Sequence, residues 1–424
     1  MLRKLAGKLA QSLRHLSCFE IEHACAVEYA CECLLFENLQ SLECNSINSS
    51  CFLARLIHQN KYTLETLKIG QEKELLAQYY KDNWTNIHHD STPLDVMRYI
   101  VDLSQLPRLS CLSLVGVDVS LLIPHVFSES PFFAELRSLT LESCNGSAAF
   151  LATMTLVFRD LQSDTTSDAL RKPMLEKFLF RQESFSTSLR DVLIQFLRSF
   201  SGLRTLSLLF ENTSVLDRIS NLIGHHGATL TQLVLETRIS PRKLSHMDTS
   251  RPFGHGGYND RLWEESTMAI CTSCPNLTEL GIGFSWKDET LRSLNCPITN
   301  IEQLRAIHIR NFPELNAQQV GNHTTREYAR KFADWVYRDI KSENPPLLES
   351  VSIGPTIYET KHPGSNPSRS VVPEWLRTHH FVVDWAKTRF GSWTAMISPV
   401  SERYLGEMRD ESELSGIFEQ VWLK

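Results

Sequence analysis

The chain lacks the two features that would place it in a membrane or on a nucleic acid. It has no uninterrupted apolar stretch near the roughly 18–20 residues that a membrane-spanning helix needs. It also has no run of five Lys or Arg, and its 43 basic residues against 49 acidic ones give a net charge of −6. Nucleic-acid binding requires a concentrated basic face. We therefore expect a soluble protein that binds neither nucleic acid nor membrane.

Catalytic and cofactor motifs are also missing. No Gly-x-Ser-x-Gly nucleophile elbow occurs in the sequence. A nucleotide fingerprint begins at Gly281 and Gly283, but Trp286 stands where the third glycine is needed for close helix–strand packing. Cys271-x-x-Cys274 is a single pair, and a zinc site needs two further ligands. The sequence therefore predicts no catalytic, cofactor-binding or metal-binding residues, no cofactor and no enzyme activity.

A secretory signal is lacking as well. The 11 cysteines are odd in number, which does not suit a disulfide scaffold and favours a reducing compartment. Six Asn-x-Ser/Thr sequons are present, and without a signal we expect them to be unused. The first nineteen residues are basic and free of acidic residues, which fits either a transit peptide or the return helix of a first repeat. We expect a cytoplasmic or nuclear protein.

What the chain has is a recurring pattern, Leu-x-x-apolar-x-apolar, found eleven times. Six of its ten spacings are 25–28 residues, and the other four are 45, 39, 47 and 44. That period is typical of leucine-rich repeats, in which each unit is a short strand plus a return segment. The matches begin at Leu13, Leu39, Leu64, Leu109, Leu136, Leu175, Leu203, Leu230, Leu277, Leu304 and Leu348.

Between the strands, apolar residues recur at helical spacing. Residues 148–161 and 188–200 each predict an amphipathic helix, and Thr324 with Glu327 fits a capping box that starts another. Strand followed by helix predicts an α/β leucine-rich-repeat solenoid, with a curved parallel sheet on the concave side and helices on the convex side. We assign residues 1–355 to this irregular solenoid, with insertions near 70–105, 142–172, 239–265 and 313–345. Residues 356–424 are expected to form a loop and a C-terminal cap.

The two outward residues of each predicted strand should line the concave face. From Leu39 onward these twenty residues are mostly small and neutral, and only four carry a formal charge. Such a face suits close contact through small polar groups, or packing by a segment of the protein itself. Loops also carry function, so the insertion around residues 251–258 is a second candidate surface. The predicted partner-binding residues are Ser138, Thr140, Thr205, Ser207, Gln232, His255 and Tyr258.

Three phrases carry a resemblance to a known family. They are Leu-Ala-Gln-Ser-Leu-Arg-His-Leu at residues 9–16, His226-Gly-Ala-Thr-Leu-Thr-Gln-Leu-Val-Leu235, and Cys274-Pro-Asn-Leu-Thr-Glu-Leu280. In these segments the chain resembles fungal F-box/leucine-rich-repeat-like proteins over roughly residues 1–355. The resemblance implies repeats that recruit substrates and an N-terminal F-box that docks on a cullin–RING ubiquitin ligase. No F-box segment is recognisable, so a link to the ligase core is expected only if an upstream segment supplies one.

The sequence thus predicts a non-catalytic protein–protein interaction module, with the substrate-recognition part of an F-box-type adaptor as its most specific form. Two other classes stay open. One is an enzyme that uses the insertion containing His255. The other is a glycosylated extracellular repeat protein.

Overall fold

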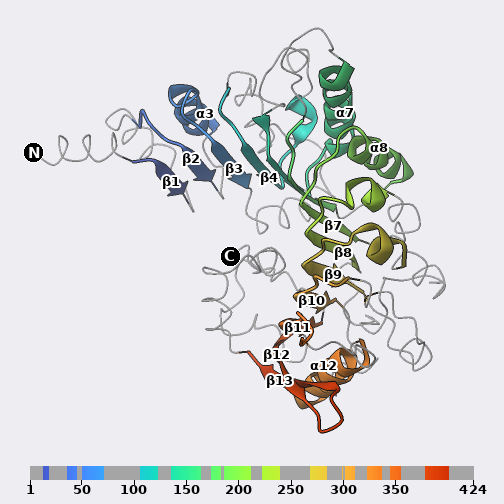
Figure 1. Ribbon diagram of the computed structural model, residues 1–424. Helices are drawn as coiled ribbons and strands as arrows, with labels where there is room; N and C mark the ends of the chain where they lie inside the picture. The colour runs from blue at the N-terminus through green and yellow to red at the C-terminus, as the bar shows by residue number, and fades with distance from the viewer. Residues whose placement is uncertain are drawn as a thin grey trace, which may run out of the picture. The chain divides into compact units, whose positions relative to one another are not determined.

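The computed structural model describes fourteen stretches of the chain: residues 13–18, 36–44, 50–70, 106–122, 135–163, 173–182, 186–211, 222–238, 268–283, 298, 301–310, 322–336, 344–354 and 378–400. The chain divides into two compact units. Unit 1 comprises residues 1–182 and 186–201, and unit 2 comprises residues 183–185 and 202–424. Each unit is a mixed α/β structure built on a mostly parallel sheet (Figure 1).

In unit 1 the strand order follows the order of the sequence, and neighbouring strands are parallel. The strands are β1 (His15–Cys18), β2 (Ser41–Cys44), β3 (Thr66–Gly70), β4 (Cys111–Val115), β5 (Ser138–Glu142) and β6 (Lys177–Gln182). The helices are α3 (Ser50–Gln59), the 3-10 helix η2 (Val119–Leu122), α7 (Ser147–Ser163) and α8 (Thr187–Arg198). In Figure 1 the three α-helices lie along one side of these strands.

In unit 2 the strand order also follows the order of the sequence, but the last two strands run antiparallel to their neighbours. Strands β7 (Thr205–Glu211), β8 (Gln232–Arg238), β9 (Glu279–Ile282), β10 (Ala306–Ile309) and β11 (Ser350–Ile353) are parallel. Two antiparallel strands follow, β12 (His379–Lys387) and β13 (Trp393–Pro399). The helix α12 (Asn322–Val336) packs on this C-terminal hairpin. Residues 379–399 of the expected cap therefore extend the sheet, while its expected closing helix beyond residue 400 lies outside the described residues.

The recurring leucines set the start of the strands. All eleven strands from β1 to β11 begin two residues after one of these leucines. Ten of the leucines are at most 1% exposed, and only Leu13, in the first repeat, is as much as 39% exposed. Each buried leucine anchors the turn that leads into its strand, which explains why the pattern locates the strands so well.

The junctions between strands also repeat a hydrogen-bond arrangement. The carbonyl of the residue before a strand accepts the N–H groups of two successive residues at the start of the next strand. The Arg14 carbonyl accepts from Gln40 at 2.7 Å and Ser41 at 3.0 Å, and the Arg305 carbonyl accepts from Glu349 at 2.7 Å and Ser350 at 3.1 Å. The same pair of hydrogen bonds at distant junctions indicates that one local arrangement is repeated along the chain.

The helix α8 shows why the return segments are helical. Ser186 caps it, because its hydroxyl accepts the Leu189 N–H at 3.1 Å. Its buried residues are Leu189, Leu193, Phe196 and Leu197, which share one face at helical spacing. This helix and α7 confirm the two helices predicted at residues 188–200 and 148–161. The predicted insertion near 142–172 is, in its described part, the long return helix α7.

Aromatic rings fill the core between β6, α7 and α8. Phe196 lies at the centre, with ring centroids 5.0 Å from Phe178, 5.7 Å from Phe158 and 5.2 Å from Phe200. All four rings are at most 1% exposed. Since Phe178 belongs to β6, its face of the sheet is the one that the helices cover. The alternate residues of each strand therefore lie on the opposite, open face.

The helix α12 begins at Asn322, so Thr324 lies in its first turn and is not the residue that caps it. Its buried face consists of Thr325, Ala329, Phe332, Ala333 and Val336. The sequence alone predicts a different face, with Tyr328, Phe332, Trp335 and Ile340 at helical spacing, but Tyr328 is half-buried. The difference arises because this helix packs on the hairpin β12–β13, a contact that the local pattern does not encode.

Side chains of α12 close the outer edge of β13. The Asp334 carboxylate accepts the Ala395 N–H at 2.8 Å, and the Arg326 guanidinium donates to the Ile397 carbonyl at 2.7 Å. Pro399 ends the strand and has no N–H to offer. Exposed strand edges promote pairing with other chains. These contacts therefore protect most of the last edge in the described part of the sheet.

Candidate partner-binding surface

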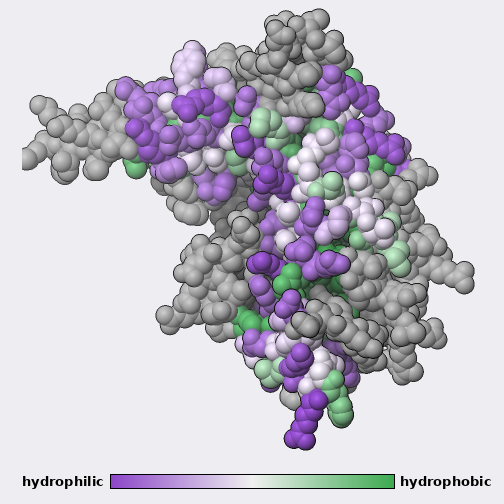
Figure 2. Space-filling view, viewed as in Figure 1, coloured by the Kyte–Doolittle hydropathy of each residue, from purple (hydrophilic) through white to green (hydrophobic). Residues whose placement is uncertain are grey.

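The outward residues of the strands are more exposed to solvent in unit 1 than in unit 2. In unit 1 the outward residues of β2–β6 are half-exposed or exposed, except for Gly70 and Arg181, which are buried. We call this surface the unit 1 open face. It consists of Ser41, Glu43, Thr66, Lys68, Cys111, Ser113, Val115, Ser138, Thr140, Glu142, Lys177, Leu179 and Arg181. Figure 2 shows mostly hydrophilic atoms over the part of unit 1 around β1–β3.

Register places small polar side chains of the unit 1 open face in rows. Ser138 pairs with Cys111 on one side and Lys177 on the other. Thr140 pairs in the next row with Ser113 and Leu179. Neighbouring strands lie about 4.8 Å apart, so the short side chains of Ser113 and Thr140 stand side by side, and those of Cys111 and Ser138 do so in the other row. A partner can approach these short side chains closely and exchange hydrogen bonds with them.

Charged side chains of the unit 1 open face pair with each other across neighbouring strands. Lys68 and Glu43 are register partners with an N–O distance of 3.9 Å, and both side chains are well exposed. Arg181 and Glu142 are register partners at 3.8 Å, with side chains only 8% and 17% exposed. The first pair flanks the neutral centre of the face and remains accessible to a partner. The second is largely shielded from water.

In unit 2 the face of the sheet that corresponds to the unit 1 open face is largely buried. Ser207, Glu279, His308 and Ser352 are at most 4% exposed. Strands β9, β10 and β11 are buried at every position, so neither of their faces is open to solvent. The expectation of one continuous exposed ladder therefore does not apply to this unit. A strand buried on both faces cannot be recognised from alternation, because inward and outward residues no longer differ in exposure.

A hydrogen-bonded chain runs across the first strands of unit 2. The Thr205 hydroxyl donates to the Gln232 side-chain carbonyl at 2.8 Å, and the Gln232 amide donates to Glu279 at 3.1 Å. Glu279 is 1% exposed, while Thr205 and Gln232 are half-exposed. The two predicted binding residues thus support a buried carboxylate. This structural role limits how freely they could turn toward a partner.

A second polar cluster surrounds His308, which is fully buried. Arg310 donates to His308 Nδ1 at 3.2 Å, so His308 Nε2 carries the proton and donates to the Gly354 carbonyl at 2.8 Å. On the next strands Ser352 and the His380 Nδ1 atom share a hydrogen bond of 2.7 Å. His308 and Ser352 are two of the twenty residues predicted to line the concave face, and the sequence did not indicate this network. The sequence gives only a weak signal for such a network, since a single His or Ser in a strand is usually a solvent-exposed residue.

The seven predicted binding residues therefore fall into three groups. Ser138 and Thr140 lie half-exposed on the unit 1 open face. Thr205, Gln232 and the buried Ser207 lie in unit 2. His255 and Tyr258 lie outside the described residues, as do the predicted insertions near 239–265 and almost all of 70–105.

The residues considered for metal binding are also placed. Cys271 and Cys274 are at most 1% exposed, and burial raises the pKa of the Cys274 thiol to about 12. Within the described ranges, no group of three or more His, Cys, Asp or Glu side chains is arranged to hold a metal ion. Nor does any helix in these ranges combine the length and apolar character that crossing a bilayer requires.

No protein-family model matches the chain, and no curated protein matches its sequence.

Proposed function

We propose that the chain is a leucine-rich-repeat solenoid that binds another protein through the unit 1 open face and performs no catalysis itself. The half-exposed rows of mostly short, uncharged side chains around Ser138 and Thr140 are the observation that carries this proposal. The bordering ion pair between Glu43 and Lys68 gives the face charged margins around a neutral centre. Polar margins around a closely packed centre are common in protein interfaces.

Several features of the repeat support the solenoid assignment. Each strand begins at a fixed distance from a leucine, and the junction carbonyls make the same paired bonds. Cys144 stands eight residues after Leu136, at the position where such repeats often carry Asn or Cys. It is 1% exposed, and its thiol lies 3.2 Å from the Leu114 carbonyl in the preceding repeat. The thiol thus links two successive repeats.

The most specific form of the proposal is a substrate receptor of the F-box type. On this view the unit 1 open face would hold the substrate, and a separate F-box would be needed for docking on the ligase core. The resemblance in the three leucine-rich phrases supports this form. The compartment that suits it is the cytoplasm or the nucleus, where the cysteines would remain reduced.

Site-specific crosslinking tests the proposal. A photo-crosslinking amino acid at Thr140 should capture a protein partner in cells, whereas the same group at the exposed Leu156 on α7 should not. The captured partner, once purified, should bind the unmodified chain directly. Thr140→Arg should weaken that binding at least tenfold without lowering thermal stability, and Leu156→Arg should leave it unchanged.

Two results would count against the proposal. One is capture at Thr140 no more frequent than at Leu156. The other is a purified partner whose affinity is the same for Thr140→Arg and the unmodified chain.

A further inference from the structure

The outward face of the parallel strands in unit 2 is buried, although the described helices lie elsewhere. Val234, His308 and Ser352 are at most 3% exposed. In unit 1, Ser113 and Thr140 hold corresponding strand positions and are half-exposed. The described helices of unit 2 lie together on the other side of its strands (Figure 1). Residues beyond the described elements therefore cover the outward face of unit 2.

This covered face has clear limits. It reaches β7, where Ser207 is 4% exposed, and it stops at β12, where Val382 is half-exposed and Asp384 is exposed. The four intervals from β7 to β11 give it a width of about 19 Å. We define the covered face by its outward residues: Ser207, Leu209, Val234, Glu279, Gly281, Ala306, His308, Arg310, Ser350 and Ser352.

The centre of the covered face is apolar and its side chains are short. Leu209, Val234 and Ala306 supply apolar surface and are at most 3% exposed. Gly281 is the register partner of Val234, and a Cβ at Gly281 would lie 3.1 Å from a methyl carbon of that valine. Toward β10 the face carries Arg310, which is 4% exposed. Since buried cations are stabilised by carboxylates, the face suits a helix with one apolar side and acidic residues beside it.

Residues 410–422 have the sequence of such a helix. Their apolar residues recur at helical spacing and form one stripe, which consists of Leu414, Ile417, Phe418, Val421 and Trp422. As a helix this segment would be about 20 Å long, close to the width of the covered face. Residues 401–424 contain six acidic and three basic side chains, so they can supply a carboxylate to Arg310. The edge of β13 does not need this stripe, because Asp334 and Arg326 already protect it.

The described chain leaves the sheet close to the covered face. The Val400 N–H donates to the His380 carbonyl at 2.9 Å. The His380 ring in turn shares a hydrogen bond of 2.7 Å with Ser352 of β11. Residue 401 therefore begins two strand spacings, or about 10 Å, from β11. The stretch 401–409 can extend by up to about 30 Å, which is enough to bring residue 410 onto the covered face.

We propose that residues 410–422 of the chain form a helix that lies on the covered face of the same molecule, with its apolar stripe on Val234 and Ala306. The chain is thus its own ligand at unit 2, and the unit 1 open face is left for another protein. A tethered segment has a high effective concentration, so a similar helix from another molecule would compete with it poorly. This inference does not depend on the partner proposed for unit 1.

Crosslinking within the full chain tests the proposal. A photo-crosslinking amino acid with an aromatic ring at Phe418 should, on irradiation of a dilute sample, join that residue to peptides that contain β8, β9, β10 or β11. The product should keep the mass of one chain. The same group at Phe390, which is 97% exposed on the tip of the hairpin β12–β13, is the matched control and should not label these strands. Links from position 418 to other parts of the chain overturn the proposal, and so does a product with the mass of two chains.

A thiol on the covered face gives a second measurement. Val234→Cys introduces a side chain of similar size, and its alkylation in the native chain should be slow. Adding Phe418→Asp should speed this alkylation at least about tenfold, because the helix then leaves the face more often, whereas adding Phe390→Asp should not. Cys274, which is buried away from this face, should keep its rate in every variant and so reports any general loss of the fold. Equal rates with Phe418→Asp and Phe390→Asp would show that other residues cover the face.

Discussion

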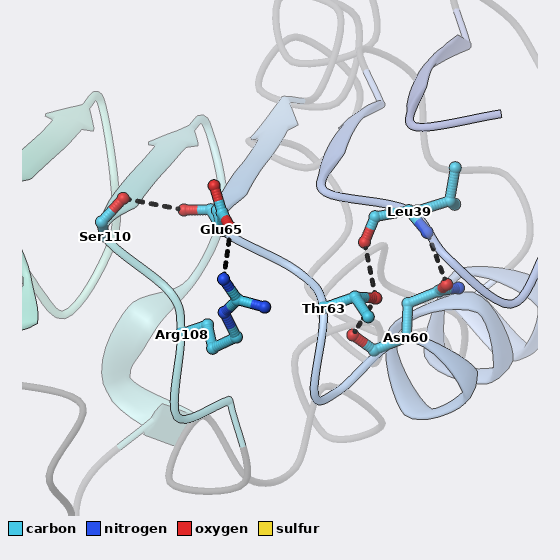
Figure 3. Close-up of polar contacts among 6 residues, drawn as sticks. All are labelled: Leu39, Asn60, Thr63, Glu65, Arg108 and Ser110. Carbon is cyan, nitrogen blue, oxygen red and sulfur yellow. Dashed lines mark hydrogen bonds and ion pairs between the residues drawn. The ribbon is translucent and has the colours of Figure 1, made fainter.

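Asn60 accepts the backbone N–H of Leu39 through Oδ1 at 2.8 Å, and so joins the end of one repeat to the leucine that opens the preceding strand (Figure 3). Its amide group also donates to the Leu56 carbonyl at 2.8 Å. Thr63 reinforces the same junction, because its hydroxyl contacts the Leu39 carbonyl at 2.8 Å. The side chain of Asn60 is 1% exposed, so water cannot replace these bonds.

Asn60→Ala should therefore destabilise unit 1. The substitution leaves the buried Leu39 N–H without its acceptor, which costs about 1–3 kcal/mol. Urea unfolding should show a lower midpoint. Tyr62→Ala, at a side chain that is 66% exposed in the same loop, should change the midpoint much less. Equal effects of the two variants would contradict the role assigned to Asn60.

Gly146 should not tolerate a side chain. Its φ is +73°, and a Cβ there would lie 2.5 Å from the backbone nitrogen of Ser120. The left-handed conformation alone costs a non-glycine residue about 1–2 kcal/mol, and the backbone clash adds to that cost. Gly202 also has positive φ, at +103°, but a Cβ there would meet nothing within 4 Å. Gly146→Ala should lower the unfolding midpoint clearly more than Gly202→Ala, and the reverse order would be inconsistent with this packing.

The buried thiols should be inert at neutral pH. Burial raises the pKa of Cys144 to about 12, although hydrogen bonds with backbone groups of Val117, Glu142 and Gly116 act to lower it, and burial likewise raises the pKa of Cys274 to about 12. Reactivity requires the thiolate. In the native chain at mildly alkaline pH, alkylation followed by mass spectrometry should modify half-buried Cys111 well before these two. After denaturation all three should react at similar rates.

The same pKa shifts predict a loss of stability in alkali. The folded chain keeps these protons, while the unfolded chain releases them from about pH 9.0 upward. The stabilisation is fully present below pH 9 and declines as the pH rises toward 12, because the unfolded state then binds fewer protons. Cys144→Ala combined with Cys274→Ala should flatten this decline in urea unfolding measured across alkaline pH. An unchanged slope would show that other groups cause it.

Removing the cap on β13 should promote aggregation. Asp334→Ala frees the Ala395 N–H, and Arg326→Ala frees the Ile397 carbonyl, so the double variant exposes a strand edge. Light scattering on heating should begin at a lower temperature than for the unmodified chain. Ser398→Ala, on an exposed residue of the same strand, should not change the onset. If all three proteins scatter alike, α12 does not protect the edge.

The sequence predicted the positions of the parallel strands far better than the hairpin and the helix packing at the end of the sheet. The leucines locate every strand from β1 to β11, because a buried leucine at a fixed offset is a local requirement of the turn. The hairpin β12–β13 has no such leucine and was not predicted. Its pairing with β11 and α12 depends on residues far apart in the chain.

The candidate surface was only partly predictable for a similar reason. Alternation correctly identified which residues face away from the helices, including Ser138 and Thr140. It could not show that Ser207 and His308 would be buried on that face, since exposure depends on what else packs there. Nor could it indicate the bond between His308 and Arg310, which requires both side chains to turn toward each other.

Sequential strand order has a mechanical consequence. Within each unit, every strand pairs only with the strands that precede and follow it in the chain. A force applied to the two ends would therefore load the outermost junction first, and its bonds would break before those of the next. Single-molecule stretching should show a succession of small extensions at low force in place of one abrupt rupture. A scaffold of this kind yields under tension in steps, and on release it can rebuild itself against the strands that remain folded.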